Sequence, residues 1–257
     1  MNIAVLGSNG FIGKSLVNYL KTNHKVFPLY RETNLLDFNI VKNFLFKNEI
    51  TVVINAAAVM KNNFFDVQNN LGIFFNFLNN HDHFIKFIDI SSGAAYNKNR
   101  NIDNISEERI FEIIPSNFYD YSQNLKIRTC YEIPNAVSLT IFNCFGSNEI
   151  DTRLFPSILK NKDVVINNDR YFDYFCVQDF LKVVEYILSN LKIKHLNLVY
   201  KNKYKISDVA KKFIKLNNLN KKIIIESESD LNYTGNGDKL NNLNLQLNGL
   251  EYGLKNY

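Results

Sequence analysis

Gly7-Ser8-Asn9-Gly10-Phe11-Ile12-Gly13 separates an apolar stretch at residues 3–6 from a stretch at residues 11–20 whose apolar side chains recur at helical spacing. Glycine therefore stands at every third position between a predicted strand and a predicted helix. Gly7 permits the turn out of the strand, Gly10 lets a phosphate approach the backbone, and Gly13 allows the helix to pack closely on the sheet. The amides of the first helical turn would face that phosphate with the positive end of the helix dipole. The predicted cofactor contacts in this stretch are Gly7, Asn9, Gly10, Phe11, Ile12 and Gly13.

Strand-like and helical stretches alternate along the first part of the chain. The strands are predicted at residues 3–6, 25–29, 52–54, 84–90 and 136–142. Such alternation is typical of a parallel sheet with helices on both faces, and the short apolar run Val52-Val53-Ile54 agrees with burial on both faces. We therefore expect an α/β fold of the Rossmann type, a doubly wound parallel sheet with a small C-terminal substrate-binding lobe.

The pattern changes after Gly146. Helices are predicted at residues 154–160, 180–191, 207–216 and 238–243, with an aromatic extended segment at residues 171–177. This mixture predicts a second, smaller lobe interleaved with the first. We assign residues 1–146 and about 171–200 to the dinucleotide-binding domain, and residues 147–170 and 201–257 to the lobe.

The composition limits the classes of protein to which this chain can belong. A chain of 257 residues with 46% hydrophobic side chains can fill the core of one α/β domain with an appended lobe. The net charge of +5 comes without a base-reading motif, so we expect no nucleic-acid partner. Cys130, Cys144 and Cys176 lack metal-ligand spacing, which predicts reduced thiols and no metal. No apolar run reaches the roughly 18 residues of a membrane span and no leader pattern is present, so we expect a cytoplasmic protein with no membrane partner.

Four further segments follow predicted strands: Asn34-Leu35-Leu36-Asp37, Asn55-Ala56-Ala57-Ala58, Ser91-Ser92-Gly93-Ala94-Ala95-Tyr96 and Asn143-Cys144-Phe145-Gly146. Together with residues 7–13 they resemble the extended short-chain dehydrogenase/reductases that modify nucleotide sugars, the NAD-dependent epimerase/dehydratase family. The resemblance spans nearly the whole chain. It implies a nucleotide-diphosphate sugar as substrate and a homodimer formed through the helices near Asn69 and Tyr119. It also implies cofactor contacts from Leu36, Asp37, Ala56, Ala57, Ala58 and Asn69.

In that family a serine or threonine, a tyrosine and a lysine carry out the chemistry, and the lysine lies four residues after the tyrosine. Here Ser92 matches the serine, and Tyr119 is our preferred match to the tyrosine, with Gln123 at the lysine position. The resemblance implies that Ser92 binds the reacting oxygen, that Tyr119 exchanges its proton, and that Gln123 contacts the cofactor ribose without supplying a charge. Tyr121 is the alternative tyrosine, followed by Leu125 at the fourth position. Lys126 lies three residues after Gln123, away from the position of the missing lysine by helical geometry, and is a poor substitute for it.

The residues after the second predicted strand bear on the choice of cofactor. An acidic residue there would select NAD, whereas this chain has Tyr30-Arg31. Arginine favours a 2′-phosphate through charge-assisted hydrogen bonds, and Arg31 resembles a phosphate-binding arginine of the fucose-synthase branch. We therefore expect NADP, with NAD left open by Glu32.

The substrate side departs from the fucose synthases. The cysteine and histidine that epimerise ring carbons in those enzymes correspond here to Ala94 and Arg153, so proton exchange at carbon is not expected, while carbonyl reduction needs neither residue. Arg153 can contact a diphosphate or a sugar hydroxyl instead. The candidate substrate contacts are Ser92, Gly93, Ala94, Asn143, Arg153 and Arg170.

Three functions are compatible with these residues. The first is an NADP-dependent reductase that transfers hydride to C4 of a 4-keto (6-deoxy) nucleotide sugar. The second is a nucleotide-sugar 4-epimerase on the same scaffold, and the third is a non-catalytic dinucleotide-binding protein in which Gln123 marks lost chemistry. A dehydratase would need an adjacent acid pair after the serine, where this chain has Gly93-Ala94.

Overall fold

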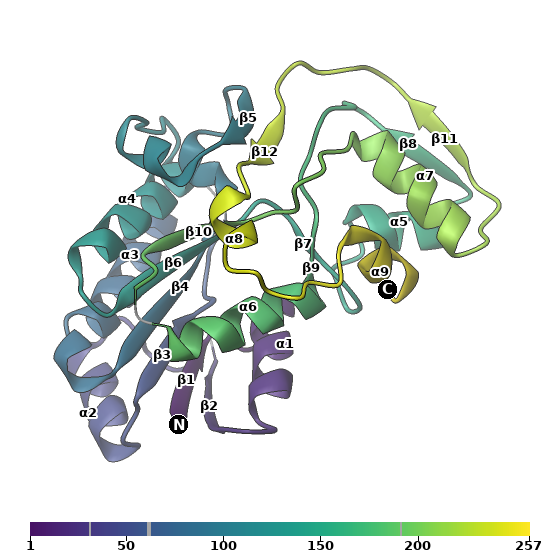
Figure 1. The fold of residues 1–257 in the computed structure, drawn as a ribbon. Coiled ribbons are helices and arrows are strands. Elements are labelled where there is room, and N and C mark those ends of the chain that lie inside the picture. Colours follow the sequence, from purple (N-terminus) through teal and green to yellow (C-terminus); the bar gives the residue numbers. More distant parts are fainter. Residues whose placement is uncertain (31, 61–62, 191) are drawn as a thin grey trace.

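The computed structural model describes residues 1–30, 32–60, 63–190 and 192–257 (Figure 1). Its centre is a parallel sheet of six strands in the order β10-β6-β4-β3-β1-β2. This confirms the predicted doubly wound Rossmann-type sheet. The bounds are β1 Asn2–Leu6, β2 Lys25–Leu29, β3 Val52–Asn55, β4 Lys86–Ser92, β6 Ala136–Ile141 and β10 His195–Leu198.

Helices cover both faces of this sheet (Figure 1). Along β1 the side chains alternate: Ile3 and Val5 pack toward α1 and α6, whereas Ala4 and Leu6 pack toward α2 and α3. α4 lies beside α3 and covers β4 and β6. The helix bounds are α1 Phe11–Leu20, α2 Phe38–Lys47, α3 Phe64–Leu78, α4 Phe118–Glu132 and α6 Val177–Ser189. None of the helices in the described ranges is both long and apolar enough to cross a membrane.

The C-terminal elements gather beyond the carboxyl end of the sheet (Figure 1). Phe155, Phe213 and Tyr257 form an aromatic cluster there with Phe145, which lies at the start of this region. The elements of this lobe are α5 Leu154–Lys160, β8 Asp163–Ile166, α7 Ile206–Leu216, β11 Lys222–Ile225 and α9 Leu250–Lys255. Short pairs connect it to the sheet domain, namely β7 Cys144–Phe145 with β9 Phe175–Cys176 and β5 Ile102–Ile105 with β12 Tyr233–Gly235, followed by α8 Asp238–Asn241. Three short 3-10 helices span His81–His83, Gly93–Tyr96 and Glu107–Phe111.

The sheet differs from the sequence prediction at two places. β4 begins two residues later than predicted and continues through Ser92, because its ladder with β6 extends to the pair Ser92↔Ile141. The sixth strand, β10, was not predicted, because His195 and Asn197 interrupt its apolar character although both are buried. The first difference matters for function, since it places Ser92 at the very end of a central strand.

Candidate active site

The three glycines of the first turn differ in what a Cβ atom at each position would contact. Gly7 has a φ of +72°, and a Cβ there would lie 2.6 Å from the carbonyl oxygen of Ala56. A Cβ on Gly13 would lie 2.2 Å from the carbonyl oxygen of Gly7. At Gly10 the nearest atom to such a Cβ is 3.4 Å away, which is ordinary contact. The protein's own packing therefore requires glycine at Gly7 and Gly13, whereas it tolerates a Cβ at Gly10, where glycine fits the close approach of a bound pyrophosphate.

This difference gives a binding test. Gly10→Ala is expected to leave the fold intact and to weaken NADP binding by roughly 10- to 100-fold, because an added methyl group that overpacks an interface costs about 1–3 kcal/mol. Isothermal calorimetry with NADP and NAD measures the effect. Gly13→Ala serves as the contrasting variant, since its Cβ collides with backbone and should lower the melting temperature. A Gly10→Ala protein that binds both dinucleotides like the wild type would contradict the assigned phosphate position.

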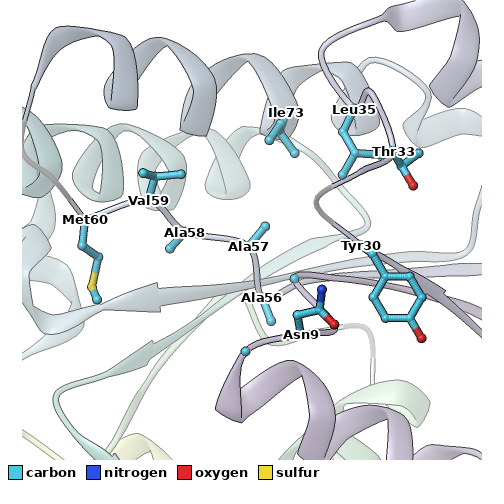
Figure 2. A pocket seen from close by; sticks show the side chains of 12 residues that line it. Asn9, Tyr30, Thr33, Leu35, Ala56, Ala57, Ala58, Val59, Met60 and Ile73 are labelled. Atoms are coloured by element: carbon cyan, nitrogen blue, oxygen red, sulfur yellow. The ribbon is translucent and has the colours of Figure 1, made fainter. Parts of the chain in front are cut away.

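A cavity of about 530 Å³ opens beside these glycines, at the carboxyl ends of β1, β2 and β3 (Figure 2). The run from Ala56 to Met60 crosses it, with Asn9 and Tyr30 on one side and Leu35 and Ile73 on the other. Asn70 fixes this run, since its side chain accepts a hydrogen bond from Val59 N and donates one to Val59 O, both at 2.9 Å. The strand order reverses at this point of the sheet, which is where open α/β sheets bind their ligands. Of the predicted cofactor contacts, the cavity is lined by Gly7, Asn9, Gly10, Ala56, Ala57 and Ala58.

The remaining predicted cofactor contacts lie outside the cavity lining. Phe11, Ile12 and Gly13 form the first turn of α1, and Asn69 lies on α3. Leu36 has an exposed side chain that borders Gly72. Asp37 is the N-cap of α2, where its carboxylate accepts hydrogen bonds from Asn39 N at 2.8 Å and Ile40 N at 3.1 Å. This local capping role explains an aspartate at that position without a ligand. Arg31 lies outside the described residues.

A second group of polar side chains lies at the ends of β4 and β6. Ser92 ends β4, and its Oγ accepts a hydrogen bond from Ala94 N at 3.2 Å. Tyr119 is in the first turn of α4, which begins after the N-cap Asn117. Its side chain is only 9% exposed and is within hydrogen-bonding reach of Ser92, whereas Tyr121 is 43% exposed. Burial and proximity to Ser92 therefore favour Tyr119 over Tyr121 as the partner of this serine.

The surroundings keep the Tyr119 hydroxyl protonated. Burial raises the pKa of Tyr119 to about 12, and the negative charges of Asp120 and Asp89 act in the same direction. The hydrogen bond with Ser92 and the positive charge of Arg153 oppose this shift but do not outweigh it. A phenol in this state is a proton donor at neutral pH.

Gln123 lies one turn further along α4 and is buried. Its Oε1 accepts a hydrogen bond from Ser91 Oγ at 3.2 Å. Within the described ranges its Nε2 is buried and has no hydrogen-bond partner. Because a buried amide donor without a partner is costly, this N–H group fits a ligand hydroxyl, such as that of the cofactor ribose. Sequence reasoning missed Ser91, the residue that orients this amide.

Lys126 occupies a different position from the missing lysine. Its Nζ lies 3.1 Å from Asp89 Oδ1, and both side chains are fully buried. Asn55 donates a second hydrogen bond to the same carboxylate oxygen at 2.7 Å. The positive charge of Lys126 is thus paired with Asp89 and is not presented to Tyr119.

The candidate substrate residues divide into two groups. Gly93 and Ala94 form the buried 3-10 turn after Ser92. Arg153 donates a hydrogen bond to Asn143 Oδ1, and its charge reaches Tyr119. Arg170 stands apart from them, since it donates to Leu231 O at 3.0 Å and lies over the ring of Phe172.

Glu149 is a further titratable group beside these residues that the sequence did not suggest. It accepts a hydrogen bond from Gly146 N at 2.9 Å, and burial raises its pKa to about 7. This glutamate lies in the loop between β7 and α5 and belongs to no motif, so only the structure identifies it.

A glycine turn beside a cavity of about 530 Å³, with a serine at the end of β4 and a tyrosine near it on α4, defines a Rossmann-type dinucleotide-binding protein of the short-chain dehydrogenase/reductase class. The chain belongs to the NAD dependent epimerase/dehydratase family, which it matches over residues 3–199. A comparison with curated proteins found no match.

Solved structures with the same fold come from several enzymes of nucleotide-sugar metabolism. A GDP-L-fucose synthetase from Naegleria fowleri bound to NADP has a TM-score of 0.84 at 19% identity, over 99% of this chain and 90% of that one. The UDP-glucose 4-epimerase from Thermotoga maritima with UDP-glucose has a TM-score of 0.84 at 19% identity, over 99% and 96%. A dTDP-4-dehydrorhamnose reductase from Clostridium acetobutylicum has a TM-score of 0.83 at 16% identity, over 100% and 98%. At these identities the likeness establishes the fold.

Proposed function

We propose that the protein is an NADP-dependent reductase that converts the C4 carbonyl of a 4-keto nucleotide sugar to an alcohol. The observation that carries this proposal is the buried Tyr119 beside Ser92, with an uncharged Gln123 where the family resemblance expects lysine. NADPH supplies the hydride to C4. Ser92 hydrogen-bonds the carbonyl oxygen and Tyr119 donates the proton to it, so that the phenolate formed is afterwards reprotonated from water.

The state of Tyr119 favours reduction over epimerisation. A 4-epimerase oxidises and then reduces the same carbon, so its tyrosine must serve as a base as well as an acid. With a pKa of about 12, only about 10⁻⁵ of Tyr119 is phenolate at pH 7, whereas nearly all of it is the acid that reduction requires. Reduction therefore uses the dominant protonation state.

The choice of NADP rests on two kinds of support. In the sequence Arg31 comes two residues after the last residue of β2, and arginine is suited to a 2′-phosphate. Structures of the same fold were solved with NADP and NADPH, and one with NAD. NAD is the second candidate, because Glu32 adjoins Arg31.

The proposed substrate class rests on the basic residue at the mouth of the site. Arg153 lies close enough to Tyr119 for its positive charge to lower the tyrosine pKa, and it donates a hydrogen bond to Asn143. From this position its guanidinium can bind a diphosphate or a sugar hydroxyl near the reacting carbon. Proteins of the same fold include reductases of GDP- and dTDP-linked sugars. We place the nucleotide-diphosphate sugar with its C4 carbonyl at Ser92.

The decisive experiment measures NADPH oxidation by the purified protein with GDP-, dTDP-, UDP- and CDP-linked 4-keto-6-deoxy sugars. Stoichiometric formation of NADP and of a C4 alcohol with one of them supports the proposal and identifies the nucleotide. Absence of turnover with all four, in protein shown to bind NADP, would refute it. Interconversion of 4-epimers without net NADPH oxidation would identify an epimerase instead.

A charge at residue 123 should change the direction that the enzyme favours. Gln123→Lys is expected to raise alcohol oxidation at pH 8 by about 10- to 1,000-fold relative to reduction, because a cation within about 4–6 Å lowers a phenol pKa by about 1–3 units. Initial rates in both directions between pH 6 and 10 measure this effect. In the wild type, reduction should show no loss from Tyr119 ionisation up to about pH 10, given the pKa of about 12.

Gln123→Met is the matched control, because it fills similar space without charge. If Gln123→Met and Gln123→Lys change the two rates alike, the charge argument is wrong. If neither variant nor the wild type turns over a substrate, the non-catalytic reading gains support.

A further inference from the structure

Tyr233 is a buried tyrosine that lies far from the catalytic motifs in sequence. It begins β12, which pairs in parallel with β5 through Tyr233↔Ile102. Its own amide donates to Tyr171 O at 2.9 Å, and its carbonyl accepts from Asp173 N at 3.1 Å. The backbone at Tyr233 is therefore held on both sides, above the carboxyl end of the sheet (Figure 1).

The ring of Tyr233 is fixed by two aromatic neighbours. It packs edge-on against Phe142 and stacks on Phe172, with centroid distances of 5.1 Å in both cases. Phe142 in turn lies between two glycines, since a Cβ on Gly93 would be 2.6 Å from its ring and one on Gly235 would be 2.5 Å away. Gly93 follows Ser92, and Gly235 follows Tyr233 by two residues. Close packing on two sides of Phe142 thus brings β12 against the turn that begins at Ser92.

The hydroxyl groups of Tyr119, Ser92 and Tyr233 form one cluster. Ser92 is within hydrogen-bonding reach of both tyrosines and lowers the pKa of each, although burial raises both pKa values by more. Tyr119 also lies close enough to Tyr233 for its charge to raise the Tyr233 pKa. Tyr233 therefore stays protonated at neutral pH, and its hydroxyl can donate a hydrogen bond to Ser92.

The Ser92 oxygen accepts one hydrogen bond and has a second potential donor nearby. The amide of Ala94 donates to Oγ at 3.2 Å, and the protonated Tyr233 hydroxyl lies close enough to Ser92 to serve as a further donor. A serine hydroxyl has two acceptor sites and one proton. A hydrogen bond from Tyr233 to the second acceptor site would direct the Ser92 proton toward Tyr119 and the place of the reacting oxygen.

We propose that Tyr233 is a positioning residue that orients the Ser92 hydroxyl for hydrogen bonding to the substrate carbonyl. This role rests on the proposed reductase function, which it extends to a residue of the C-terminal region. The pair Ser92 and Tyr233 supplies a preorganised donor for the oxygen on which negative charge develops. Such a donor is of particular value in a site where Gln123 adds no positive charge.

Kinetics of Tyr233→Phe test this role, since phenylalanine keeps both ring contacts and removes only the hydroxyl. The expected result is about a tenfold fall in kcat, the effect of one hydrogen bond, with KM and NADP affinity unchanged. Tyr174→Phe is the control, because it removes an equally buried hydroxyl from the same aromatic cluster. A Tyr233→Phe enzyme with the kcat of the wild type overturns the inference and leaves the reductase proposal intact.

A second measurement requires no substrate. In protein labelled with ¹³Cζ-tyrosine, Ser92→Ala is expected to shift the resonances assigned to Tyr233 and Tyr119 and to leave that of Tyr174 in place. Assignment follows from the three tyrosine-to-phenylalanine variants. An unmoved Tyr233 resonance refutes the contact with Ser92, whatever the activity assays show. If no nucleotide sugar is reduced but the resonance shifts, the reductase proposal fails while the Ser92–Tyr233 contact stands.

Discussion

Tyr119→Phe is expected to lower kcat for carbonyl reduction by about 10²–10⁴-fold, the usual contribution of a positioned general acid. Phenylalanine preserves the ring that packs at the start of α4 and removes only the proton donor. NADP affinity and the melting temperature should therefore stay close to those of the wild type. Single-turnover mixing of the NADP(H) complex with the reducible nucleotide sugar measures the chemical step directly, so that product release does not obscure it.

Tyr121→Phe is the matched control, because this tyrosine is the second candidate in the same helix. Its side chain is 43% exposed, so loss of its hydroxyl should leave kcat unchanged. The opposite pattern, a slow Tyr121→Phe enzyme and a normal Tyr119→Phe enzyme, would transfer the proton donor to Tyr121. Equal activity in both variants would remove tyrosine acid catalysis from the mechanism.

The glycine turn could be predicted because its signal is local. Gly7, Gly10 and Gly13 lie within seven residues, and each acts on backbone that is near it in sequence or at the next strand end. The same locality explains why five of the six sheet strands were predicted from short apolar runs. The resulting position of the cavity follows from topology alone, since it lies where the strand order reverses.

β10 escaped prediction because its polar side chains are satisfied by distant partners. The Asn197 side chain accepts a hydrogen bond from Tyr96 Oη at 3.0 Å and donates one to Ile105 O at 2.9 Å. The backbone N–H of Asn197 donates to Glu107 Oε1 at 2.9 Å. His195 lies 2.8 Å from Thr140 Oγ1 on the neighbouring strand. No hydropathy pattern contains these partners, so a buried polar strand resembles a loop in the sequence.

The candidate site was likewise predictable only where its signals are local in the sequence. Ser92 and the two tyrosines were visible as motifs, but helical spacing could not choose between Tyr119 and Tyr121. Burial favours Tyr119, and burial depends on how α4 packs beside the Ser92 turn. Tyr233 reaches the site from β12, through contacts with residues far away in the sequence. Glu149 comes from the loop after β7 and belongs to no motif.

Lys126→Met is expected to lower the free energy of unfolding by about 3–5 kcal/mol, the usual cost of removing one partner of a buried ion pair. The substitution leaves the Asp89 carboxylate buried with Asn55 as its remaining donor among the contacts described here. Urea denaturation followed by circular dichroism measures the loss. Lys211→Met is the control, because its pair with Asp208 is exposed and should contribute no more than about 1 kcal/mol.

The double variant Asp89→Asn/Lys126→Met separates the charge from the packing. If an uncompensated carboxylate causes the loss, neutralising it should recover most of the stability, whereas an equally unstable double variant would attribute the loss to packing. The result also bears on catalysis, because the charge of Asp89 raises the pKa of Tyr119. In Lys126→Met protein that remains folded, Asp89 acts without its cation, so alcohol oxidation should fall further relative to reduction. An unchanged ratio of the two rates would indicate that this buried pair stabilises the fold without influencing the acid.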